Sequence, residues 1–194
     1  LGPEFIEKSD LQEQFYTNFD DPLGLVRTLT DNPVDYSIVG GQKGWFIDLD
    51  SPPPGFPQGS PAGFPGEKAI RNIQLRGGLA FVNSIFPREL NSCVGRAGGA
   101  TLSFCPDTGG SLCFGNRAIF DLNNDGTFDA GDDINTDQTA AGVLLEDPSP
   151  PTDSTFIGDK RVTQYGRELH IIGTNTSSGD NTGRLSWKRL ESVD

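Results

Sequence analysis

The sequence predicts an all-β fold with antiparallel sheets, long loops and one calcium loop of the EF-hand type. Three observations predict it. Short runs alternate apolar with polar residues, 25 glycines and 14 prolines occur among 194 residues, and residues 121–132 are rich in Asp and Asn. Alternation with a period of two marks a half-buried strand, and frequent glycine and proline mark the turns between strands. This composition disfavours a helical bundle.

The expected strands follow one another along the chain, and helix signals are few. Residues 25–30 alternate apolar and polar side chains, and residues 44–49 are rich in aromatic groups. Residues 9–13 carry the capping pattern of one helical turn, and the stretch after the acidic loop offers a second. The remaining strand runs are residues 69–75, 79–86, 100–104, 112–120, 142–145, 155–157, 168–174 and 184–190.

The clearest local unit is a hairpin. Residues 69–75 and 79–86 flank the pair Gly77-Gly78, and glycine tolerates the positive φ angles that a two-residue hairpin turn requires. Two proline-rich stretches read as loops, because proline cannot donate to a sheet ladder. Residues 51–65 are interpreted as a long insertion between strands in preference to a proline-rich recognition strip, and residues 146–153 as a shorter insertion.

The chain contains no methionine, so we expect an excised fragment or a processed product. Residues 1–5 read as a protease-site and cloning scar, and residues 6–194 are long enough to form a single domain with its own core. The net charge of −12 disfavours nucleic acid as a partner and favours cations. No apolar run approaches the length that crosses a bilayer, so we expect no membrane segment in this fragment.

The three cysteines, Cys93, Cys105 and Cys113, predict one disulfide and one spare thiol. Their spacing matches no zinc motif, and the single histidine, His170, is far away in the sequence. Three pairings are open. We favour Cys105 with Cys113, because these two flank the turn-prone residues 107–110. A disulfide is typical of a secreted or periplasmic chain.

The segment that carries chemistry is the acidic loop of residues 121–132. With Asp121 as position one, oxygen donors fall at positions 1, 3, 5, 9 and 12, glycine falls at 6, and position 7 offers a backbone carbonyl. Calcium takes six to eight oxygens, and glycine permits the sharp turn that brings them together. The expected ligands are Asp121, Asn123, Asp125, Thr127, Asp129 (directly or through water) and Asp132.

Position 12 differs from the usual EF-hand, because Asp132 replaces glutamate and has a shorter reach. We therefore expect modest affinity, with a Kd on the order of 10⁻⁴–10⁻³ M, as in extracellular modules. Residues 118–120 read as a strand leading into the loop, in place of the usual helix. The alternative interpretation is an Asx-rich turn that binds nothing.

The sequence does not predict an enzyme. His170 lies in an apolar run typical of a strand, and no serine or cysteine has a nucleophile motif such as G-x-S-x-G. The paired carboxylates occur mostly within the calcium loop, so no catalytic residue is assigned.

Several segments, in one order, resemble the C-terminal domain of the PilY/PilC family of type IV pilus tip proteins. They cover most of residues 25–190, and none is diagnostic alone. They are Arg27–Asp35, Lys43–Leu49, Gln74–Leu79, Cys93, Thr108–Gly110, Ile119–Gly126 and Gly183–Leu190.

The resemblance implies the tail end of a longer protein, with a fold like part of a modified β-propeller. It implies an extracellular or cell-surface module at the pilus tip, exported through the periplasm, that supports pilus assembly, opposes retraction and contributes to adhesion. Its implied partners are minor pilins and host or surface receptors, and its implied metal is Ca²⁺ in the loop above. Two alternatives remain: a dockerin-like calcium-dependent docking module, and a non-catalytic part of a secreted hydrolase.

Overall fold

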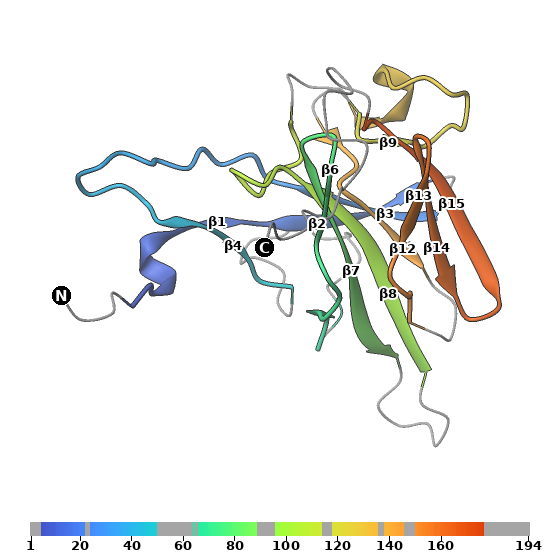
Figure 1. Ribbon diagram of the computed structural model, residues 1–194, viewed down its shortest axis with the longest axis horizontal. Helices are drawn as coiled ribbons and strands as arrows, with labels where there is room; N and C mark the ends of the chain where they lie inside the picture. The colour runs from blue at the N-terminus through green and yellow to red at the C-terminus, as the bar shows by residue number, and fades with distance from the viewer. Residues whose placement is uncertain are drawn as a thin grey trace, which may run out of the picture.

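The computed structural model describes residues 5–21, 24–49, 64, 66–88, 96–113, 118–135, 138–145 and 150–176. These residues form strands and two short 3₁₀ helices, η1 (Lys8–Asp10) and η2 (Ala130–Asp132). The expected all-β fold is confirmed (Figure 1). The strands are β1 (Leu11–Gln14), β2 (Tyr16–Asp21), β3 (Gly24–Leu29), β4 (Gly44–Ile47), β5 (Lys68–Ala69), β6 (Gln74–Arg76), β7 (Leu79–Arg88), β8 (Arg96–Phe104), β9 (Phe120–Asp121), β10 (Asp133–Asn135), β11 (Gln138–Thr139), β12 (Gly142–Leu145), β13 (Thr155–Ile157), β14 (Lys160–Tyr165) and β15 (Glu168–Thr174).

The largest unit is a seven-stranded antiparallel sheet with the order β2-β3-β12-β8-β7-β5, in which β6 also pairs with β7. Alternate residues of each strand point to opposite faces, so Leu25 and Leu29 join one core cluster while Val26 joins the other. The first face is covered by Trp45, Phe64 and neighbouring side chains. The second face is covered by a smaller sheet.

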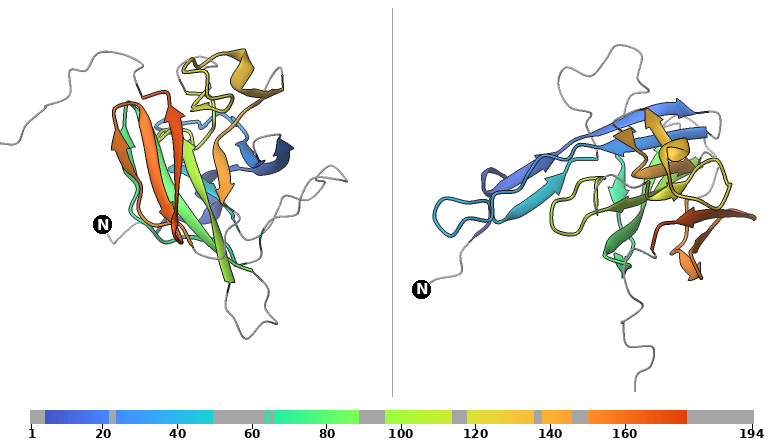
Figure 2. Two further views of the ribbon diagram at one scale, coloured as in Figure 1. Left: turned by 90° about the vertical axis from the view of Figure 1, so that its right-hand side faces the viewer. Right: turned by 90° about the horizontal axis from the view of Figure 1, so that it is seen from above.

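That smaller sheet has four strands in the order β13-β14-β15-β9. Phe120 and Ile172 bring it into the second core cluster, and Phe156 packs edge-on against Phe81 of β7 with ring centroids 4.9 Å apart. Figure 2 shows the two sheets from two further directions. The larger sheet therefore buries an apolar cluster on both faces, and the smaller sheet buries its inner face against the second of them.

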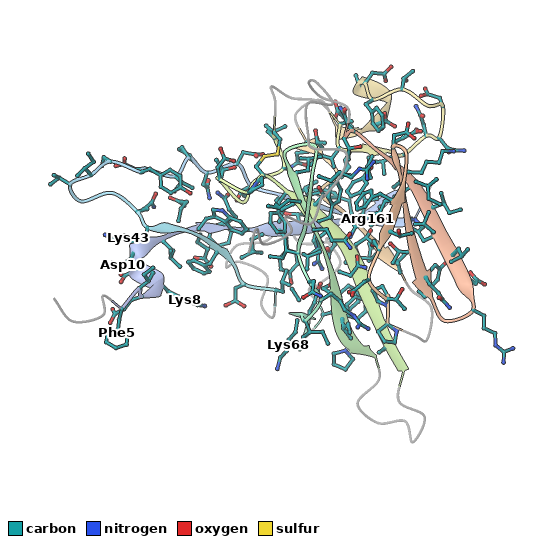
Figure 3. The ribbon with its side chains drawn as sticks, viewed as in Figure 1. Phe5, Lys8, Asp10, Lys43, Lys68 and Arg161 are labelled. Carbon is teal, nitrogen blue, oxygen red and sulfur yellow. A yellow bond between two sulfur atoms is a disulfide. The ribbon has the colours of Figure 1, made fainter. Side chains whose placement is uncertain are left out.

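Arg161 of β14 joins the two sheets (Figure 3). Its guanidinium donates to the Leu102 carbonyl at 3.1 Å and to Asn83 Oδ1 at 2.7 Å, both on the larger sheet. Burial lowers the pKa of Arg161 to about 9, so the group stays charged at neutral pH. A buried charge is tolerated when hydrogen bonds replace its hydration.

A second buried cation lies on the opposite face of the larger sheet. Arg27 forms a two-pronged ion pair with Glu67, with both N–O distances at 2.8 Å and both side chains fully buried. Asn18 accepts from Arg27 Nε at 2.9 Å, and the Tyr16 ring lies 4.2 Å from the guanidinium carbon. Because Glu67 precedes β5, this pair ties residues 66–69 to the face of the sheet.

An arm extends from the sheets, to the left in Figure 1. It consists of β1 and β4, which pair in parallel, and of the loop of residues 30–43. Cys105 and Cys113 form a disulfide, the pairing that the sequence favoured, and the loop between them holds the arm. Gln14 Nε2 donates to the Thr108 carbonyl at 2.8 Å, and Trp45 Nε1 donates to the Pro106 carbonyl at 3.0 Å.

Several expected elements are confirmed and others are corrected. The Gly77-Gly78 turn has φ angles of 57° and 80°, but the strand before it is split into β5 and β6. The expected helical turn at residues 9–13 is η1, which ends at Asp10 because β1 begins there. The strand expected at residues 112–120 is wrong at its start, because Leu112 belongs to no strand. Its N–H donates to Asp31 Oδ1 at 2.6 Å instead.

The sequence analysis did not predict β1, β2, β10, β11 or β14. The helical turn expected in the stretch after the acidic loop is wrong, because that stretch forms β10 and β11. Cys93, residues 184–190 and most of the proline-rich stretch 51–65 lie outside the described residues. Within the part of the chain that the structure describes, no helix is both long enough and apolar enough to cross a membrane.

Candidate metal site

The acidic loop begins at β9 of the small sheet and is followed by a separate two-stranded sheet. Phe120 is fully buried, and Asp121 pairs with Gly173 of β15. A Cβ atom on residue 173 would lie 2.8 Å from Asp121 Cβ, so glycine there permits the close approach. After the loop, β10 and β11 form a short antiparallel pair. The loop stands at the upper right of Figure 1.

Asp132, the expected last ligand, is the centre of the loop. It is fully buried, and its Oδ1 accepts from the Leu122 N–H at 2.7 Å and from the Asn123 N–H at 3.2 Å. Its Oδ2 accepts from the Asp129 N–H at 3.2 Å. Burial raises the pKa of Asp132, and the nearby charge of Asp121 acts in the same direction.

The first half of the loop turns around Asp121. Its two carboxylate oxygens accept from the backbone N–H groups of Asp125 and Gly126, each at 3.1 Å. Gly126 has φ of 84°, which is the left-handed conformation expected at the sixth position, and Asn124 also has a positive φ of 57°. The sharp turn that the sequence predicted is therefore present.

The second half is linked through Thr127. Its hydroxyl lies 2.6 Å from Asp125 Oδ1 and 3.2 Å from Asp129 Oδ2. Hydrogen bonds from the Thr127 side chain, and then from its N–H, lower the pKa of Asp125. Asp129 caps η2 by accepting from the Gly131 N–H at 2.7 Å.

The structure thus places the six expected ligands in one hydrogen-bonded loop. Their carboxylate oxygens, however, accept from N–H and O–H donors of the loop itself. Among the described residues, no group of three or more His, Cys, Asp or Glu side chains is arranged to hold a metal ion. What the geometry provides is a preformed turn with acidic side chains, entered through a strand as expected.

One feature near the loop has no signal in the sequence. Gly173 is needed for the close contact with Asp121, although the two residues are far apart in the sequence. His170 lies in β15 opposite Thr163, which is the sheet position that the sequence indicated. Burial, followed by the charge of Arg161, lowers its pKa. No acid–base role is supported by this placement.

Comparisons with known proteins yield a likeness in structure. No protein-family model matches the chain, and no curated protein matches it. The fold is similar to the crystal structure of the Pseudomonas aeruginosa PilY1 C-terminal domain, with a TM-score of 0.61 and 21% sequence identity. The match covers 88% of this chain and 33% of that chain, so the chain spans about a third of the solved domain. The fold expected from the family resemblance is confirmed.

Proposed function

We propose that the chain is a calcium-binding, non-enzymatic, extracellular module of a type IV pilus tip protein. In this role it supports pilus assembly, control of retraction and adhesion, together with minor pilins and host or surface receptors. The likeness to the PilY1 C-terminal domain supports the pilus assignment. The ordered donor pattern of residues 121–132 supports the metal.

The observation that carries the calcium proposal is the environment of Asp132. This carboxylate is fully buried beside Asp121, and among the described residues no Lys or Arg forms an ion pair with any of the four loop aspartates. Burying a carboxylate without a counter-charge is costly, and a divalent cation would offset that cost. The donor set is entirely oxygen, which suits calcium rather than a softer metal.

When bound, calcium would supply charge neutralisation alone. Asp121, Asn123, Asp125, Thr127, Asp129 and Asp132 would hold it, after the aspartates release some of their present N–H and O–H partners. Strands rather than helices flank the loop, which favours this assignment over a dockerin-like module.

Calcium titration by calorimetry on chelator-stripped protein tests the proposal. We expect saturable binding with a Kd on the order of 10⁻⁴–10⁻³ M and a rise in melting temperature. Asp125→Ala should abolish both effects. Asp35→Ala is the matched control, because Asp35 is an exposed aspartate that also accepts from a backbone N–H two residues on, at 2.9 Å. No heat and no melting shift in the unaltered chain would reduce the loop to an acidic turn.

A further inference from the structure

The loop that the Cys105–Cys113 disulfide closes is the place where the arm meets the larger sheet, and Figure 3 shows the disulfide there as a yellow bond. Three successive backbone carbonyls of this disulfide loop (residues 105–113) each accept a hydrogen bond from a side chain of the arm. The pairs are Trp45 Nε1 with Pro106 at 3.0 Å, the Tyr36 hydroxyl with Asp107, and Gln14 Nε2 with Thr108 at 2.8 Å. The donors come from β4, from the loop of residues 30–43 and from β1, so the disulfide loop binds every part of the arm.

The disulfide loop also binds the arm through Asp31. The carboxylate of Asp31 accepts from the Leu112 N–H at 2.6 Å and from the Ser111 hydroxyl at 3.0 Å. A Cβ atom on residue 109 would overlap the Trp45 ring, so glycine at this position lets the ring pack directly on the loop. The loop therefore holds the arm by both polar and apolar contacts.

The disulfide fixes the second end of this loop. The pairing of β8 with β7 ends at Phe104, and residues 105–113 belong to no strand. The Gly109 N–H donates to the Cys105 carbonyl at 2.8 Å, and the Cys105 N–H donates to the Gly110 carbonyl at 2.9 Å, so these bonds organise the first part of the loop. The end at Cys113 is tied to Cys105 by the covalent bond. Cleavage of that bond would therefore loosen residues 111–113, which carry both donors to Asp31.

A small molecule can reach the disulfide. A partly open cavity of about 400 Å³ lies against it and is lined by both cysteines, Leu112, Gly78 and residues 106–108. Pockets that admit small ligands have volumes of about 300–1,000 Å³. Cys113 is 8% exposed and Cys105 is 3% exposed, so Cys113 is the partner that an entering thiolate meets first.

We propose that the Cys105–Cys113 disulfide is a thiol-exchange site, and that its reduction by a small dithiol releases the arm from the disulfide loop. A thiolate of the dithiol attacks Cys113 Sγ, forms a mixed disulfide and expels Cys105 Sγ, which takes up a proton. The second thiol of the reductant then attacks the mixed disulfide, so that Cys113 also becomes a thiol and the reductant becomes a disulfide. Two electrons and two protons pass from the dithiol to the protein. This site does not depend on calcium.

The two packed sheets should stay folded in the reduced chain. Arg27 bonds to Glu67, and Arg161 bonds to Asn83 and to the Leu102 carbonyl, so these buried links lie outside the disulfide loop. Both cysteines belong to the second core cluster, and a thiol is a small apolar group that can keep this packing. Reduction therefore acts on the arm rather than on the sheets.

The first test is reduction of the intact, folded chain by dithiothreitol. Alkylation followed by peptide mass spectrometry identifies the free thiols, and NMR follows hydrogen exchange of the Trp45 indole N–H and the Leu112 amide. We expect Cys105 and Cys113 to be alkylated without loss of the far-ultraviolet circular dichroism signal. Exchange at Trp45 and Leu112 should rise on the order of tenfold, while amides of β7 and β8 stay unchanged. Alkylation that requires denaturant would overturn the proposal, as would reduction with unchanged exchange at Trp45 and Leu112.

The second test concerns the route to the disulfide. Leu112 lines the cavity, and a change of its side chain keeps the backbone N–H that donates to Asp31. Leu112→Trp should slow the reduction severalfold by narrowing the cavity, and Leu112→Ala should speed it. Melting curves of the oxidised variants show that each folds. Equal rates of reduction in the unaltered chain and both variants would contradict entry through the cavity.

Two cysteine variants are the controls for the reductant. The double variant Cys105→Ser, Cys113→Ser should show the fast Trp45 exchange of the reduced chain before any treatment, and dithiothreitol should not change it. A change there would assign the effect to another group and overturn the proposal. Cys93→Ser removes the spare thiol and should respond as the unaltered chain does. Loss of the response in Cys93→Ser would contradict direct attack by the dithiol.

Discussion

Removal of one partner from the buried ion pair is expected to destabilise the chain strongly. Glu67→Gln keeps the shape of the side chain but leaves the Arg27 charge without its carboxylate in a site where both side chains are fully buried. Both N–O contacts are 2.8 Å, and Ser84 Oγ also donates to Glu67 Oε1. Breaking such a pair costs about 3–5 kcal/mol of unfolding free energy. For a chain of this length that lowers Tm by about 6–20 °C.

Urea unfolding followed by circular dichroism measures the change. The double variant Arg27→Met, Glu67→Leu removes both charges, so it should recover most of the loss. Lys8→Gln is the control, because Lys8 forms an exposed pair with Asp48 and its loss should cost less than about 1 kcal/mol. A loss below about 1 kcal/mol for Glu67→Gln would refute the reasoning that the pair holds residues 66–69 on the sheet.

Three further predictions concern the loop, the disulfide and the histidine. Gly126→Ala should lower the free energy of unfolding by about 1 kcal/mol and weaken calcium binding, because residue 126 has a positive φ. Gly158→Ala is the control, since residue 158 also has a positive φ and open space around it but lies outside the loop, so it should lose stability alone. Calorimetry with calcium separates the two variants. Cys113→Ser should lower the free energy of unfolding by about 2.5 kcal/mol, the value for a disulfide that closes a loop of this length, and should shift the fluorescence of Trp45. An unchanged spectrum would contradict the inference that this loop holds the arm. The lowered pKa of His170 means that the unfolded chain takes up its proton first as pH falls below about 6.5. Stability should therefore fall below that pH more in the unaltered chain than in His170→Gln, and parallel urea curves in both would contradict this.

Local turn chemistry explains which parts of the fold were predictable. The Gly77-Gly78 hairpin follows from two neighbouring residues that accept positive φ, and Gly126 follows from the same property. Strand β2 was missed because one of its two buried residues, Asn18, is polar, and the burial of Asn18 depends on its hydrogen bond with Arg27 of the adjacent strand. Strand β14 was missed for a similar reason, since its inward residues are Arg161 and Thr163.

By itself, the sequence determined the all-β class, the turns and the order of oxygen donors in the acidic loop. These properties depend on neighbours within a few residues, where backbone preference and alternation act directly. Only the tertiary structure decided that Arg27 meets Glu67, that Gly173 admits Asp121, and that β9 stops short of Ile171. Those outcomes depend on which strands pair across the sheets and on how far each pairing extends, and that is settled by long-range burial rather than by local pattern.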